Sequence, residues 1–441
     1  MSRGRTGRVV GVRAMSRGRT GRPSAIAGLL IGLLLACGGS GDGQDIGQPD
    51  PQLQEKVAEL IPRLANLAHL EVQRVPIARR SSEKRLESYL LERLEIEFPD
   101  DKLSRLTDAY RAFGLLPEDV DLRRLLVDLM LEQAVGYYDP VRDVFFVKDD
   151  APEDLVDAVL VHELVHALQD QYVDLDSLMH SVEGNDARTA IQSAVEGQAT
   201  LAMMAFQLQQ MTGGEVTPTS LPDVDPDMMD VGAAASAYPE LARAPAIIQK
   251  PLLFAYLGGA RYVQRLWRQR KSHPPPFGRW LPASTEQLLH VEKILVERDR
   301  PVTLKIEEPG DGWRTVYSDN LGELETRIFF EEHLDDPGIA EQAAAGWDGD
   351  AYLLLERAGT RGLLWYTAWD SPEDAGEFVE AYRRSFITRF GGAGERESLS
   401  APDRQARIEQ ITEAGVPLVR VMEMPVGVDT PEWPGVEIGV Q

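Results

Sequence analysis

Residues 160–171 of this 441-residue chain read LVHELVHALQDQ, and the interpretation of the whole sequence depends on this stretch. Apolar residues recur at three- and four-residue spacing from about residue 153 onward, which predicts a helix that contains it. Positions four apart lie on one face of a helix. His162 and His166 can therefore each direct an imidazole nitrogen at a single metal ion. The alternative is that the two histidines share a solvent-facing stripe and bind nothing.

Glu163 gives this pair of histidines a chemical use. It lies about 100° further around the helix, where its carboxylate can reach a water molecule on the metal. Zinc in hydrolases takes three protein ligands and leaves a fourth position for water, whose pKa falls to about 7 on binding. Glu163 would accept the proton of that water as a general base. H-E-x-x-H on a helix is typical of zinc hydrolases, and a purely structural site has no use for the base.

A zinc site of this kind needs a third protein ligand, and two glutamates are candidates. Glu196, in SAVEGQATLAMM, lies in a predicted helix among apolar neighbours, where a buried carboxylate needs a partner. Gly197 follows it and would let two helices approach closely. Glu183, in SVEGND, is the competitor, but its segment has the composition of a loop. We therefore predict Glu196 as the third ligand of a Zn²⁺ ion.

At these positions the sequence resembles the gluzincin class of zinc metallopeptidases, in which a glutamate from a following helix completes the H-E-x-x-H site. GYYDP, HELVHALQDQ, VEGQAT and STEQLLH also resemble, in this order, a group of bacterial proteins of metallopeptidase type. This wider resemblance covers about residues 130–300, with AAAGWDGD and AWDSPEDAGEF further on. It implies a zincin-like domain and peptide-bond hydrolysis by a zinc-bound water, but it supplies no substrate.

The groups that support the metal ligands are left open by the resemblance. Thermolysin-like gluzincins place an aspartate four residues after the glutamate ligand, whereas this chain has Thr200 there. The orienting partner of His162 is therefore undetermined. Asp170, one turn beyond His166, can orient that histidine, because metal-bound histidines usually donate their second N–H to a carboxylate or carbonyl. It can equally be a solvent-facing residue of the helix.

A hydrogen-bond donor should stabilise the oxyanion that forms on the substrate carbonyl. The candidates are His290, Tyr137, Tyr138 and Tyr256. We select His290, which lies in STEQLLH on a predicted amphipathic helix, as the catalytic donor. Its plainer interpretation is a surface histidine.

A β-hairpin is predicted immediately before the metal-binding helix. AVGYYDPVRDVFFVK contains two β-rich runs around the turn-forming stretch DPVRD, and residues 144–147 are its second strand. The gluzincin resemblance implies that residues 144–148 form an edge strand with which a substrate backbone would pair. An ordinary sheet strand is the alternative.

Apolar periodicity predicts an α+β protein with two domains. Residues 54–300 are mainly helical and would form the zincin-like metallopeptidase domain, with the hairpin as a small sheet. Within them, residues 213–240 are rich in Gly, Pro, Asp and Ala, which indicates a surface excursion and a possible cover for the site. Residues 301–441 alternate strands with helices and would form a smaller α+β domain.

The N-terminus has the features of an export signal. The first 36 residues contain seven arginines and no acidic residue. They end in the apolar run AIAGLLIGLLLA, which is too short to span a bilayer but suits the core of a signal peptide. The octapeptide MSRGRTGR occurs at residues 1–8 and again at 15–22, and a start at Met15 would give a signal peptide of ordinary length.

Cys37 is the only cysteine of the chain and follows this run directly, in LLACGG. The segment resembles the lipobox of bacterial lipoproteins, which implies cleavage before Cys37 and lipidation of that residue. A secretory signal with a chance cysteine is the alternative. Residues 37–53, rich in Gly, Asp and Pro, would be a flexible tether. Gly38 replaces the aspartate that commonly retains lipoproteins at the inner membrane, which favours an outer membrane if one is present.

The charge of the chain excludes one class of partner. Its formal net charge is -25, and 39 basic and 71 acidic residues remain once the first 36 residues are set aside. Such a surface repels phosphate backbones, so nucleic-acid binding is not expected. The leading hypothesis is a zinc peptidase anchored to the cell envelope by lipid. The alternatives are a non-catalytic envelope lipoprotein on the same scaffold and a zinc hydrolase of a different bond.

Overall fold

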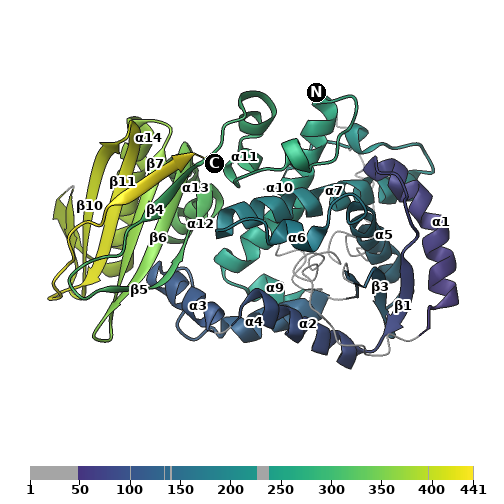
Figure 1. Cartoon of the computed structure of the whole chain (residues 1–441), viewed down its shortest axis with the longest axis horizontal. Helices are drawn as coiled ribbons and strands as arrows, with labels where there is room; N and C mark the ends of the chain where they lie inside the picture. Colours follow the sequence, from purple (N-terminus) through teal and green to yellow (C-terminus); the bar gives the residue numbers. More distant parts are fainter. Residues whose placement is uncertain are drawn as a thin grey trace, which may run out of the picture.

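Figure 1 shows the computed structural model of the chain, which describes residues 48–99, 101–133, 135–139, 142–225, 238–395 and 397–440. The predicted α+β class is confirmed: a mainly helical part with a small sheet packs beside a larger sheet with its own helices. The predicted signal peptide and Cys37 lie outside the described residues. So do residues 226–237, the centre of the predicted surface excursion.

Four long helices form the frame of the helical part. They are α1 (Pro51–Ala68), α5 (Glu153–Gln169), α7 (Asn185–Thr212) and α10 (Ala246–Gln269). Shorter helices and turns surround them: α2 (Glu83–Glu97), α3 (Lys102–Ala112), α4 (Leu122–Gln133), α6 (Leu175–Met179), η2 (Pro218–Ser220), α9 (Pro239–Arg243), η4 (Gly278–Trp280), α11 (Glu286–Leu289) and η5 (Lys293–Glu297). Among the described residues, no helix combines the length and the apolar character needed to cross a membrane.

The helices α7 and α10 cross in close contact at a pair of glycines. A Cβ atom on Gly197 would overlap the backbone of Gly259, and one on Gly259 would overlap the carbonyl of Ser193. The prediction that Gly197 permits a close helix approach is therefore confirmed. The expected partner was the helix that carries the two histidines, whereas the observed partner is α10. Because Gly197 follows Glu196, this close crossing sets the position of the Glu196 segment of α7 relative to α10.

The small sheet consists of β1 (Ile77–Ser81), β2 (Gly136–Asp139) and β3 (Val144–Lys148), in the order β1-β3-β2. The predicted hairpin is confirmed, because β2 and β3 pair antiparallel. The prediction that residues 144–148 form an edge strand is wrong, because β1 pairs with β3 in parallel and leaves it in the centre. The sequence did not predict β1, because its segment IARRS is short and carries two arginines within a region of helical periodicity.

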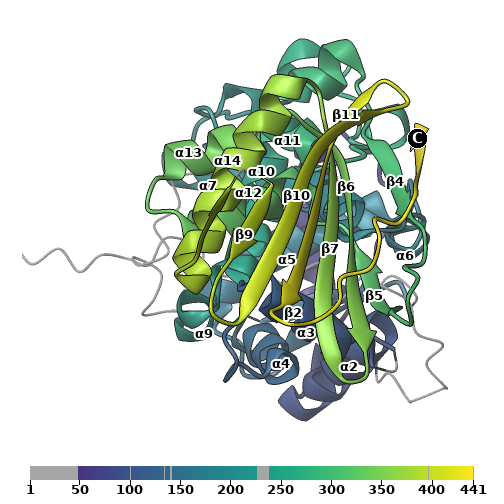
Figure 2. The ribbon, with the colours of Figure 1, turned by 90° about the vertical axis from the view of Figure 1, so that its left-hand side faces the viewer.

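The larger sheet has seven strands in the order β5-β6-β7-β11-β10-β9-β8. The strands are β5 (Arg314–Asp319), β6 (Trp347–Arg357), β7 (Thr360–Trp369), β8 (Ala393–Glu395), β9 (Ser398–Ser400), β10 (Arg404–Glu413) and β11 (Val416–Pro425). The helices of this part are α12 (Gly322–His333), α13 (Pro337–Ala344) and α14 (Pro372–Phe390). Figure 2 shows the long strands side by side with α14 against them.

Side chains alternate between the two faces of this sheet. Trp365 on β7 packs against Phe378 of α14, with ring centroids 5.1 Å apart. Its neighbour Tyr366 points to the other face, where it clusters with Leu304 of β4 (Val302–Ile306). β4 pairs antiparallel with β12 (Val436–Val440) as a separate two-stranded sheet. Both faces of the central strands are therefore covered.

The helical part and the larger sheet are joined through packed residues. The predicted boundary near residue 300 falls between η5 and β4, and one hydrophobic core continues across it. The start of α7 has glycine at its N-cap position and takes its capping groups from the C-terminal part. The amide of Asn185 donates to Asp319 Oδ1 at 2.8 Å, and the amide of Asp186 donates to Asn320 Oδ1 at 3.2 Å. The C-terminal part thus holds the helix that carries Glu196.

Candidate metal centre

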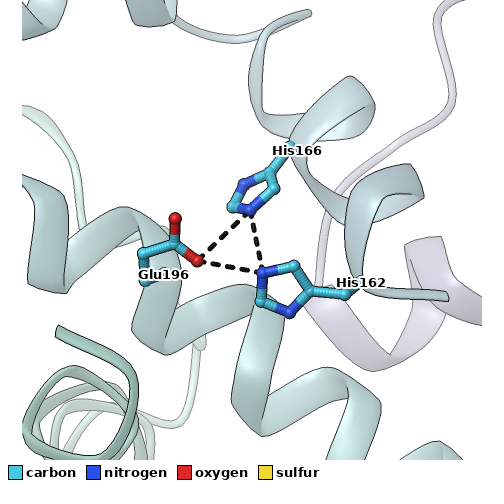
Figure 3. Close-up of side chains that lie close together, drawn as sticks. All are labelled: His162, His166 and Glu196. Carbon is cyan, nitrogen blue, oxygen red and sulfur yellow. Dashed lines mark hydrogen bonds and ion pairs between the residues drawn. The ribbon is translucent and has the colours of Figure 1, made fainter. Parts of the chain in front are cut away.

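The structure brings the three predicted ligands together (Figure 3). His162 and His166 come from successive turns of α5, and Glu196 comes from the adjacent α7. His162 Nε2 lies 2.9 Å from Glu196 Oε2 and 3.0 Å from His166 Nε2. His166 Nε2 lies 3.4 Å from the same carboxylate oxygen. The three side chains are 1%, 2% and 0% exposed, so the arrangement is buried rather than a chance surface cluster.

The arrangement fits a tetrahedral zinc ion. Zinc bonds of about 2.0–2.1 Å at tetrahedral angles separate neighbouring ligand atoms by about 3.3 Å. The three observed separations lie close to this value. Two imidazole nitrogens that face each other cannot both carry a proton, and both offer lone pairs when neutral. Two imidazoles and one carboxylate are also the ligand set of several zinc hydrolases, with the fourth position left to water.

Burial and charge act on the ligands in opposite directions. Burial lowers the pKa of His162 to about 4, so this imidazole is neutral and able to bind a metal. Burial also disfavours the charged form of His166, but the adjacent Glu196 carboxylate outweighs this effect and raises its pKa to about 9. Burial likewise raises the pKa of Glu196, but His166 and His162 outweigh it and lower the pKa to about 2. The buried carboxylate therefore demands a cation, which a proton on His166 or a metal ion can supply.

Gln169 holds His166 in the orientation that a metal ligand needs. Its Oε1 lies 2.7 Å from His166 Nδ1, and its Nε2 donates to the carbonyl of Val195 and to Gln198 Oε1, both at 2.9 Å. Because the amide nitrogen is used on a carbonyl, Oε1 must accept, so the proton of His166 resides on Nδ1. The lone pair of Nε2 is then directed at the site. Gln169 fills the role for which the sequence suggested Asp170.

Glu163 lies at the edge of the small sheet. Its Oε2 accepts a hydrogen bond of 3.0 Å from the backbone amide of Tyr138 in β2. In the β2–β3 register this amide points away from β3, so it is free to bind α5. The side chain is 5% exposed, and burial raises the pKa of Glu163 to about 7. A group with that pKa can both accept and release a proton near neutral pH.

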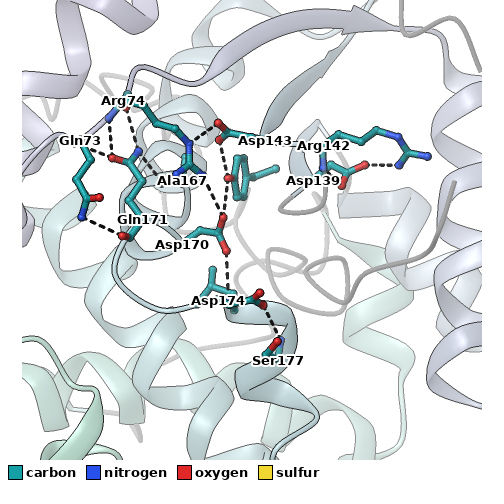
Figure 4. Close-up of polar contacts among 12 residues, drawn as sticks. Gln73, Arg74, Asp139, Arg142, Asp143, Ala167, Asp170, Gln171, Asp174 and Ser177 are labelled. Carbon is teal, nitrogen blue, oxygen red and sulfur yellow. Dashed lines mark hydrogen bonds and ion pairs between the residues drawn. The ribbon is translucent and has the colours of Figure 1, made fainter. Parts of the chain in front are cut away.

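The side chain of Tyr138 joins the end of α5 to the hairpin through Asp143 and Asp170, which Figure 4 shows together with Arg74. Its hydroxyl donates to Asp143 Oδ1 at 2.9 Å and lies 3.0 Å from Asp170 Oδ2. Arg74 pairs with Asp143 and also lies 3.5 Å from Asp170. Asp170 additionally accepts from the amide of Leu175 at 3.2 Å. Tyr138 and Asp170 thus position the hairpin against the helix, and neither points at the three ligands.

The structure does not bring His290 to the metal ligands. The helix predicted around it is divided into α11, which ends at Leu289, and η5, and His290 lies between the two as the C-cap of α11. Its Nε2 lies 2.7 Å from Glu323 Oε1, in a cavity whose lining does not include His162, His166 or Glu196. The prediction placed His290 beside the metal ligands as the oxyanion donor, and this placement is wrong.

Of the other candidates for the oxyanion donor, Tyr137 lies away from the metal ligands and Tyr256 lies beside them. The ring of Tyr137 stacks on Tyr89, with centroids 4.3 Å apart, within a different hydrophobic cluster. Tyr256 lies beside the ligands, with its ring centroid 5.8 Å from that of His162. It is buried, and it belongs to α10 one turn before Gly259, where α7 and α10 cross. Tyr256 is thus the candidate that the structure places at the site.

Two further positions that the sequence analysis considered are Glu183 and Thr200, and neither serves the predicted site. Glu183, the competitor for the third ligand, is exposed in the loop before α7 and is outside the ligand cluster. Thr200, where thermolysin-like enzymes have an aspartate, is buried one turn after Glu196. Within the described part of the chain, neither its hydroxyl nor His162 Nδ1 has a hydrogen-bond partner. Among the described residues, no side chain therefore orients His162 in the way that Gln169 orients His166.

Comparison with known proteins concerns only the C-terminal part. Residues 312–422 match a family model described as a domain of unknown function (DUF8575). The match covers about a quarter of the chain and runs from just before β5 into β11. It therefore includes most of the seven-stranded sheet and its helices but none of the three candidate metal ligands. No curated protein and no solved structure matches this chain.

Proposed function

We propose that this protein is a zinc-dependent peptidase of the gluzincin type. The observation that carries the proposal is the buried cluster of His162, His166 and Glu196, with Glu163 on the next position of the same helix. The cluster matches zinc in donor types, in separation and in its need for a cation. Glu163 distinguishes it from a structural site, because a buried carboxylate beside the ligands is what a general base requires.

The residues of the chain divide the work as follows. Zinc held by His162, His166 and Glu196 would lower the pKa of a bound water to about 7 and would polarise a scissile carbonyl. Glu163, held by the amide of Tyr138, would accept the proton of that water and pass it to the leaving nitrogen. Gln169 keeps the proton of His166 on Nδ1. Tyr256 takes the role of oxyanion donor, which the sequence had assigned to His290.

The location of the enzyme is proposed from the sequence alone. The arginine-rich leader, the apolar run and Cys37 support export and attachment to the bacterial cell envelope by a lipid on that cysteine. The strongly acidic composition supports a peptide or protein substrate over a nucleic acid.

Metal content is the decisive test. The chain from residue 38 onward is purified, reconstituted with zinc and measured by mass spectrometry, beside His166→Ala, Glu196→Ala, Glu183→Ala and Glu163→Gln. We expect one zinc per chain in the parent, in Glu183→Ala and in Glu163→Gln, and loss of zinc in the other two variants. A folded parent that takes up no zinc would overturn the proposal.

Activity assays then separate the reaction classes. Casein, short peptides and amide-containing cell-wall fragments serve as substrates, and Glu163→Gln is the control that retains zinc but lacks the base. We expect peptide hydrolysis in the parent and a loss of about 10²–10⁴-fold in this variant. Cleavage of cell-wall amides alone would instead indicate a zinc hydrolase of a different bond. A zinc-loaded protein that cleaves none of these substrates would favour the non-catalytic alternative.

A further inference from the structure

Four large hydrophobic side chains are exposed close to one another in the helical part. Val72, Val75 and Ile77 are 39%, 46% and 39% exposed, and Tyr172 is 43% exposed. The other exposed large hydrophobic side chains of the described residues come one at a time from separate parts of the chain. Single exposed apolar residues are ordinary on a protein surface, whereas a contiguous group indicates an interaction site. These four residues are called the apolar patch below.

Side chains just beyond the end of α5 hold the patch together, as Figure 4 shows in part. Gln171 Oε1 accepts from the amides of Gln73 at 2.8 Å and Arg74 at 3.0 Å, and its Nε2 donates to the carbonyl of Arg74 at 3.0 Å. The amide of Glu71 donates to the hydroxyl of Tyr172. The segment that carries the aliphatic side chains is therefore fixed against the end of α5 in a conformation that exposes them.

The chain enters its folded part beside this patch. The amide of Asp50 donates to the carbonyl of Ala78 at 3.0 Å, and Gln54 Nε2 donates to the carbonyl of Pro76 at 3.1 Å. Pro76 separates two members of the patch, and Ala78 follows the second of them. The start of α1 is thus bound directly to the segment that carries the patch.

The predicted lipid anchor is also close to this point. Gln48, the first described residue, follows Cys37 by eleven residues. A fully extended chain of that length reaches about 36–40 Å, and a flexible one spans about 17–20 Å on average. A lipid on Cys37 would therefore keep the start of the folded part within about 40 Å of the bilayer.

The charges around the patch do not favour an anionic surface. Arg74 pairs with Asp143, and Arg80 Nε lies 3.5 Å from Asp50 Oδ2. Glu71 is exposed, and the chain as a whole is strongly acidic. Attraction to anionic headgroups is therefore weak on this face. Aliphatic side chains and a tyrosine suit the interfacial region of a bilayer instead, where one end of the group is apolar and the other is wet.

We propose that the apolar patch docks on a lipid bilayer, with its aliphatic side chains inserted among the headgroups. The bilayer is the one that holds the lipid on Cys37, so the proposal rests on the location proposed above. The patch itself would bind lipid whether or not that cysteine is modified. Gln171 joins this face to the end of the metal-binding helix, so the docked protein would hold that end of α5 toward the bilayer.

A single fluorescent label in the patch tests the docking. The chain from residue 38 onward contains no cysteine, so Val75→Cys takes one environment-sensitive dye. Phosphatidylcholine vesicles at millimolar lipid should shift the dye emission to shorter wavelength, and lipid spin-labelled at the headgroup should quench it. Val296→Cys, at a site that is 68% exposed, is the matched control and should show neither effect. No response from the dye on Val75→Cys would overturn the proposal, as would an equal response from the control.

Flotation of the unlabelled protein with the same vesicles measures the contribution of the patch. Val75→Ser combined with Ile77→Ser should lower the partition coefficient at least tenfold, and Val296→Ser should leave it unchanged. The melting temperature of each variant shows whether the fold is intact. An unchanged partition coefficient in the folded double variant would contradict the proposal. A dimer of the parent chain that the double variant dissolves would assign the patch to a second copy of the chain and overturn it.

The two parts of the proposal fail separately in these experiments. The chain from residue 38 carries no anchor, so vesicle binding reports on the patch alone. Mass spectrometry of the exported full-length protein reports on the lipid at Cys37. Docking without a lipid on Cys37 would overturn the proposed anchor, and a lipid on Cys37 without docking would overturn the proposed patch.

Discussion

Replacing Gln169 by leucine removes the group that orients His166 while keeping the length of α5 and a side chain of similar size. The wild-type side chain is fully buried and makes three hydrogen bonds, to His166 Nδ1, to the carbonyl of Val195 and to Gln198 Oε1. In Gln169→Leu the proton of His166 can move to Nε2, where it blocks the lone pair that the metal needs. The variant therefore separates orientation of the ligand from the ligand itself.

Two losses of different kind follow from this geometry. Loss of a partner that orients a metal-bound histidine typically lowers metal affinity about 10–100-fold, which corresponds to about 1.4–2.7 kcal/mol. In addition, the carbonyl of Val195 and the oxygen of Gln198 lose a donor in a buried position, at a cost of about 1–3 kcal/mol. The first loss appears in zinc affinity, and the second appears in stability even without metal.

A chelator competition assay measures the zinc affinity, and urea unfolding in excess chelator measures the metal-free stability. Gln171→Leu is the matched control, because Gln171 lies two residues further along and bonds the chain at Gln73 and Arg74 instead of a ligand. We expect Gln169→Leu to lose zinc affinity about 10–100-fold and Gln171→Leu to keep it. Wild-type zinc affinity in Gln169→Leu would refute the reasoning that the buried amide sets the proton position of His166.

Three further outcomes are expected. Gly197→Ala should lower the free energy of unfolding by about 3 kcal/mol or more, because a Cβ there overlaps the backbone of Gly259. The melting temperature should fall with it, and an unchanged melting temperature would contradict the close crossing of α7 and α10. Asp319→Ala should cost about 1 kcal/mol in urea unfolding, because it uncaps α7, and a cost near zero would show that the cap is dispensable. Burial raises the pKa of Asp186 to about 7 in the folded protein. The unfolded chain therefore releases this proton at lower pH than the folded protein does. The free energy of unfolding of the metal-free protein should fall by up to roughly 4 kcal/mol as pH rises from about 4 to about 7. Urea unfolding at both pH values checks this, and Asp186→Asn should flatten that part of the profile.

The sequence predicted well those features that depend on short separations along the chain. The two histidines share a helix face because a helix repeats every 3.6 residues, whatever packs around it. The hairpin before α5 and the alternation of strands and helices after residue 300 were recognisable from turn residues and from periods of two and of 3.6. Gly197 also indicated a close helix contact, but the predicted partner, the helix of the two histidines, was wrong, because the partner is α10.

The sequence failed where the answer depended on segments that are distant along the chain. β1 lies more than sixty residues before β3, and its pairing removes β3 from the sheet edge. His290 and Tyr256 were equal candidates by residue type, and only the crossing of α7 and α10 places Tyr256 beside His162. Gln169 was overlooked because its role depends on Val195 and Gln198 of another helix, which use its amide nitrogen.

The sequence by itself determined the chemistry that is available: two imidazoles and a base on one helix, and a glutamate in an apolar environment further on. The sequence also favoured Glu196 over Glu183, and the tertiary structure agrees, but only the tertiary structure decided that His290 belongs to a separate cavity with Glu323. The physical reason is that helical periodicity fixes neighbours within one turn of a helix. The packing of α5, α7 and α10 fixes which side chains from separate helices share a buried space, and no local pattern encodes that choice.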